Sequence, residues 1–496
     1  MAQGRAGPTS PATQLRSEKL ACSEDKQARF KIPKRLTMAK TMHESTHLDF
    51  CSLRDETVVE LMQPTAGRQT PPKHIRFRSH PLARAVKNCG TSHFYTDTAD
   101  REELHDLLVA EEDSQDIVLY EEVDGNTTNQ PLVVKVLDRF LGQDSADNVA
   151  TWIKRLQKEK PDLSVEEAAV LIYSIINGRL GLEVIDYYSA GRIWQISLEL
   201  HTALAQDPGA SKRVGRWLNQ AVPHAFVKVP FTPDNPHCFL IARDLENQGI
   251  AVNFTTTFSA RQVVAAALLA NPHRTNVFLG RLSQGLGSEL LGEQVVLETQ
   301  RQITRLRQTF GIRTLNMLAS VRRWQTMVLT AGCDVYTVPY PVLKAFFTQT
   351  EIGAEQIQNC LNADYTDRLA ISDKVLKKVG LEKIQQLYQV EPEFLEFLIE
   401  LRGSADYESI DGEDLFKRFD EAGFGDLFYS PSRSEWRELR KGKLPDLDSE
   451  LTRTLPLDTL YSLLAVGDFI NFQDRMDEMI RASVEHLLTP RVAAAY

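Results

Sequence analysis

Short runs of β-branched and aromatic residues alternate in the middle of the chain with longer segments of helical periodicity. Eight such runs occur, at 93–97, 117–123, 193–199, 225–229, 250–255, 276–279, 314–320 and 335–338. Most are separated by a segment of helix length, such as 259–270, which is rich in Ala, Leu and Val and stops at Asn271 and Pro272. Eight strand–helix units in about 250 residues predict an α/β fold of the (β/α)8 TIM barrel type.

An open, doubly wound sheet is the alternative to the barrel. Such a sheet normally carries a glycine-rich phosphate loop after its first strand. Neither GxGxxG nor GxxxxGK[S/T] follows the first run, so the barrel is favoured. The segment 132–190 is longer than one crossover helix requires, and it predicts two or three helices inserted beside the barrel.

The patterns change on both sides of this region. The first 90 residues lack sustained periodicity, and beyond about residue 346 the strand signal gives way to amphipathic helices. These helices are expected within 372–388, 393–401, 413–422 and 468–488. We therefore divide the chain into a partly disordered N-terminal extension (1–90), a barrel (91–347) and a helical C-terminal extension (348–496).

Composition and charge narrow the function classes. With 42% hydrophobic and 25% charged residues, the chain has a globular composition, and its net charge of -10 argues against nucleic acid or an anionic membrane surface as partner. No apolar run approaches the roughly 20 residues of a membrane span. Six cysteines without metal-ligand spacing predict reduced thiols in the cytoplasm. The basic first 40 residues leave organellar import as the alternative to a plain tail.

Polar residues stand at the carboxyl ends of the predicted strands, which converge on one mouth in a (β/α)8 barrel. Each of them alone is more often a paired or surface group than a functional one. Together they predict a site at that mouth. They are Asp97, the segment 126–129 with Thr127 and Asn129, Glu199, Lys228, Asn253, Thr255, Arg281, Ser320 and Arg322.

Lys228 is the sharpest candidate, because it is the one charged residue in the apolar run 225–230 and must point into the barrel or its wall. Desolvation of such a lysine lowers its pKa, so that a fraction becomes free amine and can attack a ketone to form a Schiff base. The alternative is a lysine that extends along the wall to the rim.

Schiff-base chemistry requires further groups, and other strand ends supply them. Glu199, acting through a water held by Thr255, is a suitable proton shuttle for carbinolamine formation and dehydration. Asp97 can act as base or acid at the sugar hydroxyl that becomes a carbonyl when a carbon–carbon bond breaks. A phosphorylated substrate is predicted by an anion site on the last three strands, made of Arg281, Ser320 and Arg322.

The histidines show no HxH or HExxH pairing. A metal site is therefore not expected. The sequence predicts a metal-independent enzyme without a cofactor.

The segments that carry these residues resemble those of the transaldolase family, a class I aldolase group built on the (β/α)8 barrel. The resemblance covers about half the chain, from His93 to Phe347, with every motif in the family's order. The matching segments are Tyr95-Thr-Asp97-Thr, Thr127-Thr-Asn129, 191–199, Phe226-Val-Lys228-Val-Pro230, 249–255, Phe278-Leu-Gly-Arg281 and Ala319-Ser320-Val-Arg322.

The resemblance implies the Schiff base on Lys228, with Asp97, Glu199 and Thr255 catalytic. It also implies a substrate-binding set of Thr127, Asn129, Asn253, Asn276, Phe278, Arg281, Ser320 and Arg322. Family members that transfer a dihydroxyacetone unit have Glu and Phe where this chain has Glu199 and Phe278, whereas the related fructose 6-phosphate aldolases have Gln and Tyr. Transfer between sugar phosphates in the pentose phosphate pathway is thus implied, as is a homodimer.

Two departures touch the donor end of the site. Gln130 follows Asn129, with Pro131 one place later than in the family, and Asn276 stands where many members have Ser. Two alternatives therefore remain open. One is a related aldolase of a specialised sugar pathway with a different ketose donor. The other is a non-catalytic barrel scaffold whose helical extension binds a partner.

Overall fold

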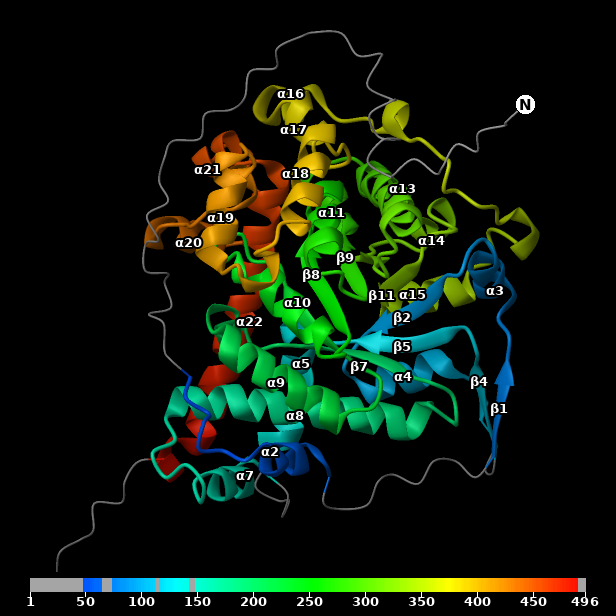
Figure 1. Cartoon of the computed structure of the whole chain (residues 1–496). Coiled ribbons are helices and arrows are strands. Elements are labelled where there is room, and N and C mark those ends of the chain that lie inside the picture. The colour runs from blue at the N-terminus through cyan, green and yellow to red at the C-terminus, as the bar shows by residue number, and fades with distance from the viewer. Residues whose placement is uncertain (1–47, 65–73, 113–115, 142–147, 489–496) are drawn as a thin grey trace, which may run out of the picture.

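The computed structural model describes residues 48–64, 74–112, 116–141 and 148–488. At its centre, eight parallel strands close into a barrel whose strands follow one another in chain order (Figure 1). They are β2 (His93–Asp97), β5 (Val123–Thr127), β6 (Gln195–Glu199), β7 (Ala225–Pro230), β8 (Val252–Thr257), β9 (Arg274–Phe278), β10 (Leu315–Ala319) and β11 (Val335–Pro339). The predicted (β/α)8 barrel is confirmed.

One of the eight predicted strands was wrong. The run 117–123 falls mainly in β4 (Asp116–Tyr120), which lies outside the barrel between β1 (His74–Arg78) and β3 (Val109–Glu112) in a three-stranded sheet. Its place in the barrel is taken by β5, which reads Val-Asp-Gly-Asn-Thr. At Gly125 in β5, a Cβ atom would lie 1.9 Å from the carbonyl oxygen of Gln195 on β6. Close backbone approach, rather than strand propensity, therefore decides which segment enters the barrel.

Helices follow the barrel strands and cover the barrel. They include α4 (Arg101–Leu108), α9 (Pro208–Ala221), α10 (His237–Asn247), α11 (Ala260–Leu269), α12 (Leu279–Leu286), α13 (Leu291–Phe310), α14 (Gln325–Leu329) and α15 (Tyr340–Thr348). Their ends follow local sequence. The Ser259 side chain caps α11 by accepting from the Gln262 N–H, and the helix ends before Asn271, which has a φ of +47°.

The described chain between β5 and β6 holds four helices rather than the predicted two or three. They are α5 (Gln130–Val136), α6 (Asp138–Leu141), α7 (Val149–Leu156) and α8 (Val165–Tyr188). α8 begins with a capping box between Ser164 and Glu167. Among the described residues, it is the one helix long and apolar enough for a membrane span, but it is almost wholly buried, packed against β6, α7, α9 and the C-terminal helix.

The C-terminal region forms helices, as the periodicity predicts. They are α16 (Asp373–Val379), α17 (Leu381–Gln385), α18 (Pro392–Arg402), α19 (Gly412–Glu421), α20 (Arg433–Leu439), α21 (Glu450–Thr454) and α22 (Leu457–Leu488). α22, drawn in red in Figure 1, begins eleven residues earlier than expected and packs against α5, α7, α8 and β8. The Ser462 hydroxyl donates to the Thr256 carbonyl of β8 at 2.9 Å. The longest C-terminal helix is thus attached directly to a barrel strand.

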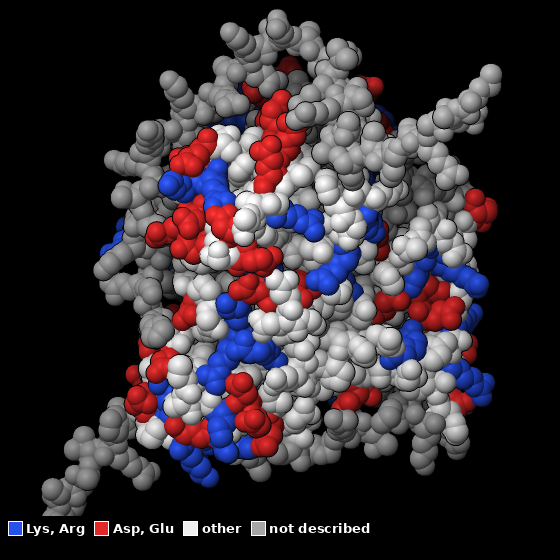
Figure 2. Space-filling view, viewed as in Figure 1, with Lys and Arg blue, Asp and Glu red and all other residues white. Residues whose placement is uncertain are grey.

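The N-terminal region is visible only in part, because the basic first 40 residues lie outside the described residues. Its helix α2 (Asp55–Met62) packs against α8 and α9. On the face shown in Figure 2, Lys and Arg side chains are interspersed with Asp and Glu. The described residues therefore present no continuous basic surface on that face.

Candidate active site

Strand register brings three predicted site residues to one level of the barrel. Glu199 on β6 pairs with Lys228 on β7, and Lys228 pairs with Asn253 on β8. Paired residues on neighbouring strands project to the same face of the sheet. Lys228 lines one cavity together with residues of β2, β9 and β10, so that face is the barrel interior, and the Lys228 and Glu199 side chains are only 3% and 1% exposed there. The expectation that the Lys228 side chain points inward is met.

The Lys228 ammonium lies between two oxygen atoms. Its Nζ atom is 2.9 Å from Glu199 Oε2 and donates a hydrogen bond of 3.1 Å to the Thr128 carbonyl. Burial raises the pKa of Glu199, the nearby Lys228 charge opposes that shift, and Asp97 adds to it. A carboxyl with a raised pKa beside an amine is suited to taking a proton from it and returning it.

Asp97, at the end of β2, is held by neighbours on both sides. Its Oδ1 atom accepts a 2.8 Å hydrogen bond from the Thr127 hydroxyl and a longer one, of 3.4 Å, from the Asn129 side chain. Thr127 also lies 2.6 Å from the hydroxyl of Thr337 on β11. The predicted Thr127 and Asn129 therefore fix the Asp97 carboxylate at the rim of the barrel interior.

A cavity of about 240 Å³, which we call the mouth cavity, opens at this end of the barrel. Eight of the predicted site residues line it, namely Asp97, Asn129, Lys228, Asn276, Phe278, Arg281, Ser320 and Arg322. The lysine and the aspartate thus share one cavity with the predicted anion site. Its size suits a small polar ligand that reaches from Lys228 toward the arginines.

The arginine end of the mouth cavity has a strained, closely packed backbone. Ser320 adopts a φ of +62°, which is uncommon for a residue with a side chain. Gly280 lies so close that a Cβ atom there would be 2.0 Å from the Ser320 carbonyl oxygen. Arg281 stands in the first turn of α12, where the helix dipole favours an anion. Burial lowers the pKa of both Arg281 and Arg322, since it disfavours the charged form.

Buried polar atoms without a hydrogen-bond partner in the described chain gather around this site. They include Asn253 Oδ1, Thr255 Oγ1, Asn276 Oδ1, Ser320 Oγ, and the Nε and Nη1 atoms of Arg281. Such atoms are uncommon in folded proteins and call for an explanation where they cluster. A polar ligand in the mouth cavity would satisfy those of Asn276, Ser320 and Arg281, which line it, so the cluster is a mark of a functional site.

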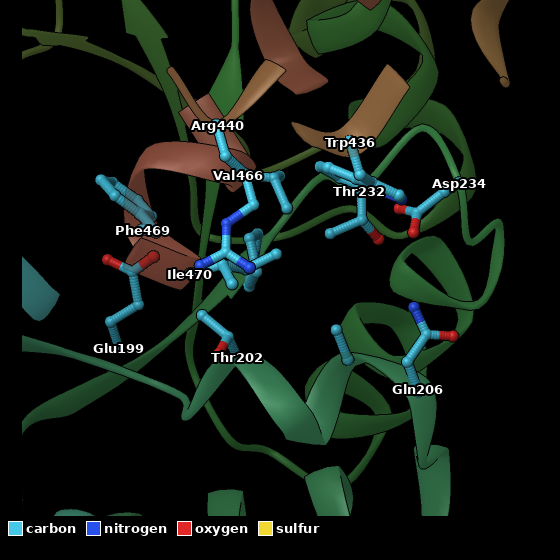
Figure 3. A pocket seen from close by; sticks show the side chains of 12 residues that line it. Glu199, Thr202, Gln206, Thr232, Asp234, Trp436, Arg440, Val466, Phe469 and Ile470 are labelled. Carbon is cyan, nitrogen blue, oxygen red and sulfur yellow. The ribbon is translucent and has the colours of Figure 1, made fainter. Parts of the chain in front are cut away.

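A second, smaller cavity of about 40 Å³, the side cavity, meets Glu199 from the other direction. Glu199 and Phe469 stand at one end of it, and Asp234 and Gln206 at the other (Figure 3). It has room for a few water molecules. Burial raises the pKa of Asp234 to about 6. The side cavity therefore gives the Glu199 carboxyl a second, mainly apolar opening that shares Phe469 with the mouth cavity.

Some predicted residues do not line the mouth cavity. Thr127 supports Asp97, Asn253 donates to the Ser197 hydroxyl at 2.9 Å, and Thr255 stands at a register shift between β8 and β9. The unusual Gln130 donates to the Leu200 carbonyl at 3.0 Å. Its side chain therefore ties the start of α5 to the end of β6 and does not face the cavity.

Sequence reasoning missed several residues of the site. Thr337, Lys443 and Phe469 line the mouth cavity, and Asp468 pairs with Arg281. Thr337 could have been found as a polar residue on the last barrel strand. Lys443, Asp468 and Phe469 lie more than 100 residues beyond that strand, and nothing in their local pattern points to the barrel.

Comparison with known proteins adds to this geometry. A family model described as transaldolase/fructose-6-phosphate aldolase matches residues 94–390. A transaldolase of Chlamydia muridarum is 26% identical over 258 residues, which cover 49% of this chain and 75% of that protein. A probable transaldolase of Carboxydothermus hydrogenoformans is 28% identical over 212 residues, covering 42% and 84%. Another, of Rhodospirillum centenum, is 26% identical over 289 residues, covering 55% and 96%. The family match includes the barrel and ends before α22.

Proposed function

Because the chain belongs to the transaldolase/fructose-6-phosphate aldolase family, we propose that it is a transaldolase that works through a Schiff base on Lys228. It transfers a dihydroxyacetone unit from a ketose phosphate, sedoheptulose 7-phosphate or fructose 6-phosphate, to an aldose phosphate. This reaction belongs to the pentose phosphate pathway. The observation that carries the proposal is the buried contact of 2.9 Å between Lys228 and Glu199, beside a cavity that Asp97 also lines.

In the first half of the reaction, Glu199 takes a proton from the Lys228 ammonium, and the free amine attacks the ketone carbon of the donor. The resulting carbinolamine loses water as Glu199 returns the proton through a water held by Thr255, leaving a protonated Schiff base. Thr255 Oγ1 is buried without a partner in the described chain, which supports its role in holding that water. No metal or cofactor takes part in these steps.

Carbon–carbon cleavage follows on the Schiff base. Asp97 takes the proton of the donor's C4 hydroxyl, the C3–C4 bond breaks, and an aldose phosphate leaves as its carbonyl forms. The electron pair of the broken bond passes into the Schiff base, giving an enamine of dihydroxyacetone on Lys228. Addition of the enamine to an acceptor aldehyde, with Asp97 returning the proton, and hydrolysis of the new Schiff base complete the transfer.

The donor's phosphate is held at the other end of the cavity. Arg281 and Arg322 supply the positive charge, and the Ser320 hydroxyl supplies a donor in its strained turn. With the phosphate fixed there, the sugar chain runs past Asp97 and Asn276 to Lys228. The acceptor, erythrose 4-phosphate or glyceraldehyde 3-phosphate, uses the same phosphate end. Phe278 lies at this end and supports transfer over simple aldol cleavage by the family resemblance.

Borohydride reduction tests the proposal. The protein is incubated with fructose 6-phosphate, reduced and analysed by peptide mass spectrometry, with Lys228→Ala as control. We expect one reduced dihydroxyacetone unit on Lys228 in the wild type and no adduct in the variant. Adding erythrose 4-phosphate before the reductant should yield sedoheptulose 7-phosphate in place of the adduct. Absence of an adduct on folded protein with either ketose phosphate would overturn the proposal.

A further inference from the structure

Two residues from outside the family-matched region reach the anion end of the mouth cavity. Asp468 Oδ2 lies 2.9 Å from Arg281 Nη2, and both side chains are less than 10% exposed. Lys443, in the loop between α20 and α21, lines the cavity and has its Nζ atom 3.5 Å from the same Asp468 oxygen. The described structure thus joins an acid and a base of the C-terminal region to a barrel arginine.

These contacts come from one face of α22. Asp468, Phe469 and Phe472 are adjacent or one turn apart on the helix, so they share a side. Phe469 lines the mouth cavity and its ring centre is 6.3 Å from that of Phe278. The Lys443 Nζ atom lies 5.4 Å from the centre of the Phe472 ring. α22 therefore supplies a wall of the cavity as well as a carboxylate.

The charges at this end determine how strongly it attracts a phosphate. Arg281, Arg322 and Lys443 contribute three positive charges, and Asp468, beside Arg281 and Lys443, offsets one of them. The Asp97 carboxylate also acts on Arg322. A phosphate monoester carries about -1.5 to -2 at neutral pH. Asp468 leaves the Nε and Nη1 atoms of Arg281 without a partner in the described chain, so a phosphate can still bind that guanidinium. Asp468 therefore lowers the positive charge that the phosphate meets without blocking its contact with Arg281.

We propose that Asp468 and Lys443 set the phosphate affinity of the site, Lys443 by direct attraction and Asp468 as a positioning residue that holds Arg281 and offsets its charge. This inference deepens the proposed function and rests on it. The C-terminal region then contributes residues to the substrate site, in addition to packing over the barrel. A transaldolase must release each phosphorylated product, and the offset charge keeps the phosphate from binding too tightly.

The test measures the initial rate of borohydride-trapped adduct against ketose concentration, for fructose 6-phosphate and for dihydroxyacetone, which has no phosphate. We expect Asp468→Asn to lower the half-saturating concentration of fructose 6-phosphate about tenfold, equal to about 1.4 kcal/mol. We expect Lys443→Gln to raise it about fivefold. Neither variant should change the value for dihydroxyacetone. Asp474→Asn, on the same helix and paired with Arg440, is the matched control and should change neither value.

Asparagine keeps an oxygen that can accept from Arg281, and a thermal unfolding scan of each variant verifies the fold. An unchanged or raised fructose 6-phosphate value in folded Asp468→Asn would overturn the inference, since Asp468 would then only support Arg281. If that variant fails to fold, Lys443→Gln decides, and an unchanged value overturns the inference.

Failure of the proposed function looks different, because no adduct forms with either ketone. Calorimetric titration with inorganic phosphate then compares the wild type and the variants without any need for catalysis. Tighter binding to Asp468→Asn and weaker binding to Lys443→Gln would uphold the charge balance. Equal binding to all three proteins would overturn it.

Discussion

The Lys228 ammonium and the Glu199 carboxylate form an ion pair at 2.9 Å in the barrel interior, where both side chains are almost completely buried. Buried pairs of this kind add little net stability, because desolvation of the two charges offsets their attraction. Their proximity fits the proton transfer that we propose between them. The side cavity beside Glu199 has room for water.

We expect Glu199→Gln to slow the formation of the Schiff base about 100-fold while leaving Lys228 in place. Glutamine has nearly the same shape but cannot accept the lysine proton. The initial rate of borohydride-trapped adduct formation measures the effect. An unchanged rate would mean that another group deprotonates Lys228.

The pH dependence of the same rate gives a matched control. Because burial raises the pKa of Glu199, its carboxylate gains a proton at a higher pH than an ordinary glutamate. As the pH is lowered, the wild-type rate should therefore begin to decline while the pH is still above 4.5, because the Glu199 carboxylate is protonated and no longer acts as a base. In Glu199→Gln this limb should be absent.

Asp97→Asn should separate Schiff-base formation from bond cleavage. The variant keeps the Lys228 amine, but asparagine cannot take the proton of the donor's C4 hydroxyl. We expect transfer to fall by about 100-fold to 10,000-fold, and the adduct trapped with fructose 6-phosphate to retain the whole sugar phosphate. Mass spectrometry distinguishes this adduct from a reduced dihydroxyacetone unit.

Asp116→Asn, on β4 outside the barrel, is the control and should give the wild-type adduct. A dihydroxyacetone-sized adduct in Asp97→Asn, formed at the wild-type rate, would show that a different group cleaves the bond. The hydrogen bonds that Thr127 and Asn129 donate to Asp97 would then hold a carboxylate that takes no part in cleavage.

The barrel and the central site residues could be predicted from sequence for a physical reason. Strands of a parallel barrel are buried on both faces, so an inward lysine such as Lys228 interrupts an apolar run and is easily seen. Glu199 ends β6 and Ser320 directly follows β10, and closure of the barrel brings such strand ends together whatever their separation along the chain. Asn253 instead lies near the start of β8 and reaches the same level through its register with Lys228.

The errors arose where long-range packing overrides local pattern. The run 117–123 has the alternation of a strand and forms one, but in the outer sheet. The true second strand, with Asp124, Gly125 and Asn126, has weak strand propensity. Asp468 reaches the cavity because α22 packs along β8, and Lys443 reaches it from the loop between α20 and α21, two helices that pack against α22. These tertiary contacts have no local signal.

Asp234 predicts an unusual dependence of stability on pH. Burial raises its pKa from 3.8 to about 6, so folding favours the protonated acid. Its contribution to stability is complete below pH 3.8 and is lost as the pH rises through about 6. We expect Asp234→Asn to raise the free energy of unfolding at pH 7.5 by about 3 kcal/mol. Urea denaturation measures this difference.

The same variant supplies its own control in acid. Near pH 3, below both pKa values, the wild-type carboxyl is mostly neutral in the unfolded as well as the folded protein, so the stabilities of wild type and Asp234→Asn should converge. A difference that stayed constant across this range would assign the effect to packing in the side cavity and not to the charge of Asp234.

Gly125 predicts a steric limit on the barrel itself. A Cβ atom there would lie 1.9 Å from the Gln195 carbonyl oxygen and 2.7 Å from Tyr95 Cε1. Backbone cannot yield as a flexible side chain does, so Gly125→Ala must push β5 away from β6. We expect a loss of about 3 kcal/mol or more in the free energy of unfolding, measured by urea denaturation.

Gly442→Ala is the matched control, because a Cβ atom at Gly442 meets nothing within 4 Å. If both substitutions have the same small effect, the close approach of β5 and β6 does not select glycine, and strand propensity would have to explain why β5 enters the barrel.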